Sequence, residues 1–164
     1  MKARAACVAA AIGLAAPAPA PADWTVVASA HDYFLEFDPD WVRVQGPYAM
    51  AWTRMTFTVP QHVLETGAKY QSQLQLHAVD CATSASTVVG AVLYSGALGR
   101  GEAVHRTPRP RAEWQPKPVQ AGSLGGLTVQ LTCAELARRT AQPAADVGKP
   151  GDKIPPPRTA PRKK

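Results

Sequence analysis

The feature that most constrains this chain is a pair of cysteines, Cys81 and Cys133. A third cysteine, Cys7, lies in a segment that we expect to be removed on export, so an even number remains. In an oxidising compartment such a pair is most simply a disulfide. It closes a loop of about 53 residues, for which chain entropy predicts roughly 4 kcal/mol of stabilisation. The chain has no C-x-x-C spacing that favours a metal or redox pair.

The first 22 residues predict that export, because they have the parts of a secretory signal peptide. Lys2 and Arg4 form a short positive start, an uncharged run follows, and alanine then alternates with proline. The uncharged run is too short to span a bilayer, and no other stretch is long and apolar enough. We expect cleavage before Asp23, since a cut two residues earlier leaves proline just past the cleavage point. Cys7 lies too near the N-terminus to be a lipoprotein cysteine, so we expect a protein without lipid.

The net charge of +6 is unevenly distributed along the chain. Residues 138–164 hold eight basic and two acidic residues, whereas residues 23–137 carry a net charge of −2. Residues 140–164 contain six prolines and no aromatic residue, which predicts a disordered basic tail after a domain of residues 23–139. The pI of about 9.5 is therefore no sign of a basic binding face on the domain. A nucleic-acid partner is not expected.

Short runs in which apolar and polar residues alternate predict half-buried β-strands. These runs cover residues 24–28, 33–37, 41–44, 48–58, 70–78, 87–94 and 102–107. Asp38 and Asp40 flank a proline and are expected to form a turn rather than an acid–base pair. The alternation slips within residues 48–58, so we expect a bulge near Thr53 and Arg54.

Three other segments are harder to assign. Residues 59–68 look like a loop, and four prolines argue against regular structure in residues 108–118. Cys81 falls on the polar face of its strand, so either a bulge precedes it or the disulfide forms at the strand end. Residues 123–139 are ambiguous, because alternation at residues 127–133 favours a strand while Ser123 could cap a helix.

Few residues point to chemistry. The four histidines are scattered, without metal-ligand spacing or a catalytic motif, so we expect no catalytic residue, metal or cofactor. His77, which lies among glutamines, is expected to be solvated. The four tryptophans are expected in the core or at its edge, with an exposed aromatic binding patch as the alternative. One basic run reads either as a solvated loop or as a site for an anionic partner: Arg100, Arg106, Arg109, Arg111 and Lys117.

Several motifs, taken in order, resemble the surface-adhesin protein E-like family. They are Tyr33-Phe34-Leu35-Glu36-Phe37-Asp38, Trp41-Val42-Arg43, Met50-Ala51-Trp52-Thr53-Arg54, Asp80-Cys81, Trp114, Val119-Gln120-Ala121-Gly122-Ser123 and Cys133. The resemblance covers residues 24–134. It implies an α+β fold, a mainly antiparallel sheet of about six strands with one C-terminal helix tied to it by the disulfide. That implication favours a helix from about Ser123, against the local alternation.

The same resemblance implies a non-enzymatic binding protein similar to surface adhesins, whose partners are extracellular-matrix or cell-envelope components. The alternative is a periplasmic protein that binds a small ligand such as haem, or one that responds to envelope stress. This chain lacks the lipoprotein cysteine, has Ala121 where the family tends to have proline, and adds a basic tail. The first difference leaves the periplasm, the cell surface and the medium open as destinations. A homodimer is left open as well.

Overall fold

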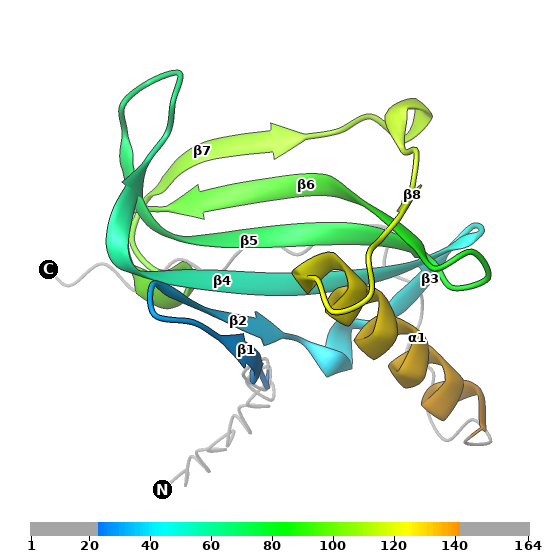
Figure 1. The fold of residues 1–164 in the computed structure, drawn as a ribbon. Helices are drawn as coiled ribbons and strands as arrows, with labels where there is room; N and C mark the ends of the chain where they lie inside the picture. Colours follow the sequence, from blue (N-terminus) through cyan, green and yellow to red (C-terminus); the bar gives the residue numbers. More distant parts are fainter. Residues whose placement is uncertain (1–22, 142–164) are drawn as a thin grey trace, which may run out of the picture.

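The computed structural model describes residues 23–141 as an antiparallel sheet with one helix packed on one of its faces (Figure 1). The main strands lie in the order β1-β2-β4-β5-β6-β7, and the two short strands β3 and β8 pair with β4 and β6. This is the expected α+β class, with about six main strands. The elements are β1 (Thr25–Ser29), β2 (Tyr33–Phe37), η1 (Pro39–Trp41), β3 (Arg43–Gln45), β4 (Tyr48–His62), β5 (Lys69–Asp80), β6 (Ala85–Tyr94), η2 (Ala97–Gly99), β7 (Ala103–Pro108), η3 (Arg111–Glu113), β8 (Lys117–Pro118) and α1 (Leu124–Ala141).

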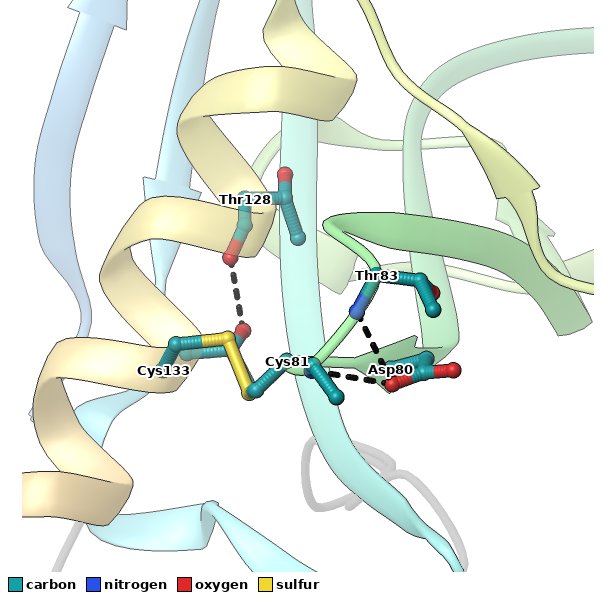
Figure 2. The surroundings of a disulfide bond; sticks show 7 residues. Asp80, Cys81, Thr83, Thr128 and Cys133 are labelled. Carbon is teal, nitrogen blue, oxygen red and sulfur yellow. Dashed lines mark hydrogen bonds between the residues drawn. A yellow bond between two sulfur atoms is a disulfide. The ribbon is translucent and has the colours of Figure 1, made fainter.

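The disulfide ties α1 to the sheet. Cys81 lies just after the end of β5 and is bonded to Cys133 on α1 (Figure 2). The turn that carries Cys81 is held by the Asp80 carboxylate, whose Oδ1 accepts hydrogen bonds from the backbone N–H groups of Ala82 and Thr83 at 2.9 and 3.3 Å. The disulfide expected from the cysteine count is therefore present. It forms at a strand end, which was one of the two arrangements left open.

Residues 124–141 form a helix and not the strand that local alternation favours. Ser123 caps it, because its Oγ accepts a hydrogen bond from the N–H of Gly126 at 3.0 Å. Gly126 has to be a glycine, since a Cβ there would collide with the carbonyl oxygen of Gln120. Two buried threonines, Thr128 and Thr132, satisfy their hydroxyl groups by donating to the carbonyls four residues earlier, at 2.9 and 2.7 Å.

The helix face that meets the sheet has helical spacing. Val129, Cys133 and Leu136 stand at positions i, i+4 and i+7, and they pack with the buried side chains of Ala49 and Val79. The helix ends at Ala141, so Thr140 and Ala141 belong to the folded part and not to the tail. The expected signal peptide and the rest of the tail lie outside the described residues.

Some expectations for the strands are wrong. Thr53 and Arg54 pair regularly with β5, and the irregularity of β4 lies between Thr56 and Gln61 instead. The change of face that suggested a bulge arises because β4 is covered on both faces, so apolar side chains occur on each. β4 also continues to His62 through part of the expected loop. The proline-rich segment contains regular structure: the end of β7, η3 and β8.

The second face of the sheet, opposite α1, is covered by loops. An ion pair lies there: the Arg54 guanidinium on β4 donates to both carboxylate oxygens of Glu36 on β2 at 2.6 Å, and it stacks on Trp24 at 4.4 Å. The η2 hairpin closes over Arg54, whose Nη1 donates to the carbonyl oxygen of Leu98 at 3.2 Å. Ser72 Oγ accepts a hydrogen bond from the N–H of Gly99 at 2.8 Å, which fixes the hairpin to β5.

Candidate functional site

Four half-buried aromatic residues gather on the face opposite α1. Trp41, Tyr48, Trp52 and Trp114 all pack on one cluster of buried side chains, formed by Met50, Leu76, Ala78 and Val89. We call these four residues the aromatic row. All four tryptophans are half-buried, as expected for the edge of the core, and three of them are in this row. Their partial exposure leaves ring surface facing solvent.

β4 sets the direction of the row. Tyr48, Met50 and Trp52 alternate along the strand and so project from one face, which places Tyr48 and Trp52 about 13 Å apart. The Trp41 ring meets Trp52 edge-on, with 5.8 Å between centroids. The Trp114 ring is tilted against Tyr48 at 6.4 Å. Aromatic pairs at these separations are attractive and hold one another in place.

Trp114 directly follows η3, in the short ordered segment between β7 and β8. Its indole Nε1–H donates to the carbonyl oxygen of Arg109 at 2.9 Å, and its backbone N–H donates to the carbonyl oxygen of Arg111 at 3.1 Å. These bonds form the turn of η3 and hold the indole beside Tyr48. The segment therefore does not behave as the unstructured loop that its prolines suggest.

Two arginines flank the aromatic row. The Arg111 guanidinium lies 5.8 Å from the centre of the Trp114 ring, and that of Arg43 lies 6.0 Å from the centre of the Trp41 ring. Both arginines are exposed. The Arg43 Nη1 group donates to the carbonyl oxygens of Asp40 and Val42 at 2.7 and 2.9 Å, which fixes that guanidinium beside its ring. Such cation–π contacts contribute about 0.5–1 kcal/mol at exposed positions.

The five basic residues singled out in the sequence do not form one patch. Arg109 and Lys117 lie near the start of β6, because Arg109 Nη1 donates to Thr87 Oγ1 at 3.3 Å and Lys117 pairs with Ser86. The two are on opposite faces, since Thr87 pairs with Ala78 and Ser86 with Val79, whose side chain faces α1. Arg106 pairs with Val92 further along β6, and Arg100 lies in the η2 hairpin beyond its end. All five are exposed. Of them, only Arg111 stacks on the aromatic row.

Arg43 was missed by sequence reasoning. It is separated from Arg111 by 68 positions. The two come to one face because β3 pairs with β4 and because Trp114, beside Arg111, packs on Tyr48. A faint signal exists in the sequence, since Arg43 follows Trp41 by two residues in an expected strand. A basic residue two positions from an aromatic one shares its strand face, which would have placed the cation near the ring.

The expectation of a solvated His77 is wrong. His77 is buried under α1, only 7 % exposed, and its Nε2 lies 2.9 Å from Thr53 Oγ1. Burial lowers the pKa of the His77 imidazole from 6.5 to about 4, so the ring is neutral at physiological pH. It lines a groove of about 310 Å³ between the first half of α1 and the sheet, together with Gln73, Gln75 and Thr128.

No metal site is found in residues 23–141, where no three His, Cys, Asp or Glu side chains are grouped for coordination. Asp38 caps η1 by accepting a hydrogen bond from the backbone N–H of Trp41 at 3.2 Å, so its turn role is confirmed. Partial burial raises the pKa of the Asp38 carboxyl. None of the helices in that part of the chain has the length and apolar character needed to cross a membrane.

The family model of surface-adhesin protein E matches residues 24–134. Two crystal forms of Haemophilus influenzae protein E align with TM-scores of 0.52 and 0.52 at 16% and 17% identity, covering 76% and 77% of this chain and 94% and 99% of those chains. Protein E from non-typeable Haemophilus influenzae aligns with a TM-score of 0.51 at 15% identity, covering 77% and 86%.

Identities this low establish the shared fold alone. No curated protein sequence matches the chain significantly. The family model spans the sheet, the disulfide and the first half of α1, and the four residues of the aromatic row lie within its limits. On this match the chain is a member of the surface-adhesin protein E family.

Proposed function

We propose that this chain is an exported, non-enzymatic binding protein of adhesin type, whose partner is an extracellular-matrix or cell-envelope component. The observation that carries the proposal is the aromatic row with an arginine stacked at each of two rings. Aromatic and arginine side chains dominate the energetics of many binding surfaces, because both offer large contact areas and directed interactions. Family membership supports the same class of function.

Binding is tested with the full mature chain on immobilised matrix proteins and on isolated envelope fractions. The wild type is compared with Arg43→Gln/Arg111→Gln, which removes both flanking charges while keeping exposed polar side chains. We expect retention to fall at least about threefold for the partner that the row contacts. Equal retention of both proteins on every fraction contradicts a role for this face, and retention on none contradicts the binding function.

Cellular location is tested separately, because a surface role requires exposure outside the cell. Intact cells are treated with a protease, and a known periplasmic protein serves as the control for leakage. We expect this chain to be degraded while the periplasmic control survives. Survival of both proteins favours the periplasmic alternative.

A second candidate function, binding of a small ligand, rests on the groove beneath α1. Its volume of about 310 Å³ lies near the lower end of ordinary ligand sites, and both His77 and Met55 line it. Haem is the ligand to test, and Met55 is the side chain of this groove to substitute, because methionine is a common axial ligand of haem iron whereas His77 Nε2 is already hydrogen-bonded to Thr53 Oγ1. A haem titration should shift the Soret band if the groove binds it, and Met55→Leu should weaken that shift. No shift at micromolar haem contradicts this candidate.

A further inference from the structure

The side chains of the aromatic row are half-buried and extend along the sheet. Tyr48 and Trp52 are about 13 Å apart along β4. Trp41 packs beside Trp52, and Trp114 packs beside Tyr48. Two cavities of the described residues lie elsewhere, both against α1. A ligand of this face therefore lies along the sheet and contacts flat ring surfaces.

Hydrogen-bond donors border these rings. Within residues 23–141, the Nε and Nη2 groups of Arg43 and the whole guanidinium of Arg111 have no hydrogen-bond acceptor. Neither arginine forms an ion pair with a carboxylate of that region, whose ion pairs join Glu36 and Glu135 to other arginines. Arginine matches the planar geometry of carboxylate and sulfate oxygens, with which it forms paired hydrogen bonds.

The charge near Arg111 is mainly basic. Residues 106–117 hold four basic residues and one acidic residue, Glu113, and Arg106 and Arg109 lie on the face of the row, whereas Lys117 pairs with Ser86 and so lies on the helix face. At the other end of the row Asp38 and Asp40 lie near Arg43, without an ion pair to it. Stacking already orients the two guanidinium groups beside their rings, so a bound anion need not immobilise a freely rotating side chain. An anionic ligand with flat apolar faces complements both features.

From this combination we infer that the aromatic row is a binding site for an acidic polysaccharide, a chain of sugar rings that carries sulfate or carboxylate groups. The apolar faces of the sugar rings stack on Trp52, Tyr48 and Trp114, and the anionic groups are bound by Arg43 and Arg111. The inference rests on the proposed binding function and specifies its ligand class. Sulfated and carboxylated chains share this chemistry, so the experiment includes one of each.

A lipid surface and a protein partner fit the same face less well. Membrane insertion requires exposed large hydrophobic side chains. Within residues 23–141 these are Val26, Val44, Val59 and Leu64, and none of them is in the row. A protein hot spot is usually compact and fully desolvated, whereas the rings of the row are spread along the sheet. Extended carbohydrate needs neither property.

The test uses the full mature chain with three probes: a heparin oligosaccharide, a hyaluronan oligosaccharide and neutral dextran. Binding is followed by tryptophan emission, because three of the four tryptophans lie in the row and a ligand held by the basic tail alone leaves them unperturbed. We expect both acidic probes to change the emission and dextran to leave it unchanged. Affinity should fall with added salt, as expected for exposed charges.

The decisive variants carry matched charge changes. Arg43→Gln/Arg111→Gln should raise the Kd for the heparin oligosaccharide about tenfold, since it removes two charge-assisted contacts. Lys69→Gln/Arg100→Gln removes two exposed charges from the opposite end of the sheet and should change the Kd less than about twofold. Lys69→Gln/Arg100→Gln should melt like the wild type, because both side chains are exposed. Arg43→Gln/Arg111→Gln should remain folded but melt somewhat lower, because it removes two cation–π contacts and the backbone hydrogen bonds of the Arg43 guanidinium.

Equal weakening by the two double variants overturns the inference, as does heparin binding without any change in tryptophan emission. If matrix or envelope proteins are bound through Arg43 and Arg111 but neither acidic oligosaccharide is, the inference fails while the proposed function stands. If no fraction and no oligosaccharide is bound, the proposed function fails as well.

Discussion

The His77 imidazole on β5 is hydrogen-bonded to the Thr53 hydroxyl on β4, with 2.9 Å between Nε2 and Oγ1. Both side chains are buried in the layer between the sheet and α1, beside Thr128. The pair joins neighbouring strands on the face that receives the helix. It is a neutral polar contact in a place where a charge is costly, and stability should therefore depend on pH.

Acidification between pH 6.5 and about 4 should destabilise the fold through His77. The folded protein holds the pKa of this imidazole at about 4, against 6.5 as the ordinary value, so in this range the unfolded chain binds the proton and the folded one does not. The loss reaches about 2–3 kcal/mol near pH 4.5. Urea unfolding at pH 7.5 and 4.5 measures it.

The control for this prediction is the exposed histidine of the β4–β5 hairpin, His62. His62→Gln should preserve the loss of stability between the two pH values, whereas His77→Gln should remove most of it. Glu135 titrates in a different range, because hydrogen bonds from Arg138 and Arg139 lower the pKa of its carboxyl from 4.5 to about 2. Its stabilisation is present above pH 4.5 and is lost only as the pH falls toward 2. An unchanged pH dependence in His77→Gln contradicts the assignment.

Sequence reasoning placed the strand that contains His77 correctly but misjudged its environment. Alternation assigns Gln73, Gln75 and His77 to one face, and this much is right. Alternation does not show which part of a strand face is covered by another element. Here α1 buries His77 and leaves the two glutamines at the half-open groove.

The helix was misread locally for a related reason. Residues 127–133 alternate in polarity by chance, while the contacts that matter, Val129, Cys133 and Leu136, follow a helical period. Thr128 and Thr132 look like exposed polar positions in the sequence, yet they are buried because their hydroxyl groups are hydrogen-bonded inside the helix. The family resemblance, which sums evidence over the whole domain, gave the right answer. The sequence left an exposed aromatic patch open as an alternative, but it could not show which rings meet, because η3 and β4 come together only in the folded chain.

Removing the disulfide should lower stability substantially. Cys81→Ser or Cys133→Ser opens a closure of 52 positions between α1 and the end of β5. Loss of a native disulfide from a small exported domain costs about 2–5 kcal/mol, which lowers Tm by roughly 10 °C or more. Thermal melts of the single variants and the double variant measure this, and peptide mapping without reductant identifies the linked peptides. Two free thiols in protein from the native host would contradict the bond.

Breaking the ion pair between Glu36 and Arg54 should also be costly. Their side chains are 7% and 14% exposed, so removal of one partner leaves a largely buried charge. Arg54→Met should destabilise the fold by about 3 kcal/mol, and Glu36→Gln/Arg54→Met should recover part of that loss. Chemical unfolding of the two proteins measures the difference. A single variant as stable as the wild type contradicts a structural role for the pair and for its contact with Leu98.

The folded part should end at Ala141 and not at Ala137, because the last turn of α1 supports η1. Arg139 Nη2 donates to the carbonyl oxygen of Pro39 at 2.6 Å and its Nη1 to that of Val42 at 3.2 Å. A chain that ends at Ala141 should melt within about 2 °C of the full mature chain, because a proline-rich segment without aromatic residues contributes little burial.

A chain that ends at Ala137 should melt several degrees lower, since it loses both contacts of Arg139 and its ion pair with Glu135.

The same two truncations separate the tail from the domain as sites for anionic surfaces. With Arg138 and Arg139 assigned to the helix, the domain is neutral overall and residues 142–164 carry a charge of +4. Binding to anionic vesicles at low salt should therefore drop strongly once residues 142–164 are removed, and binding by the full chain should weaken as salt is added. Equal vesicle binding by the full chain and the chain that ends at Ala141 would place the anion-binding groups on the domain, where residues 106–117 and Arg43 are the first candidates.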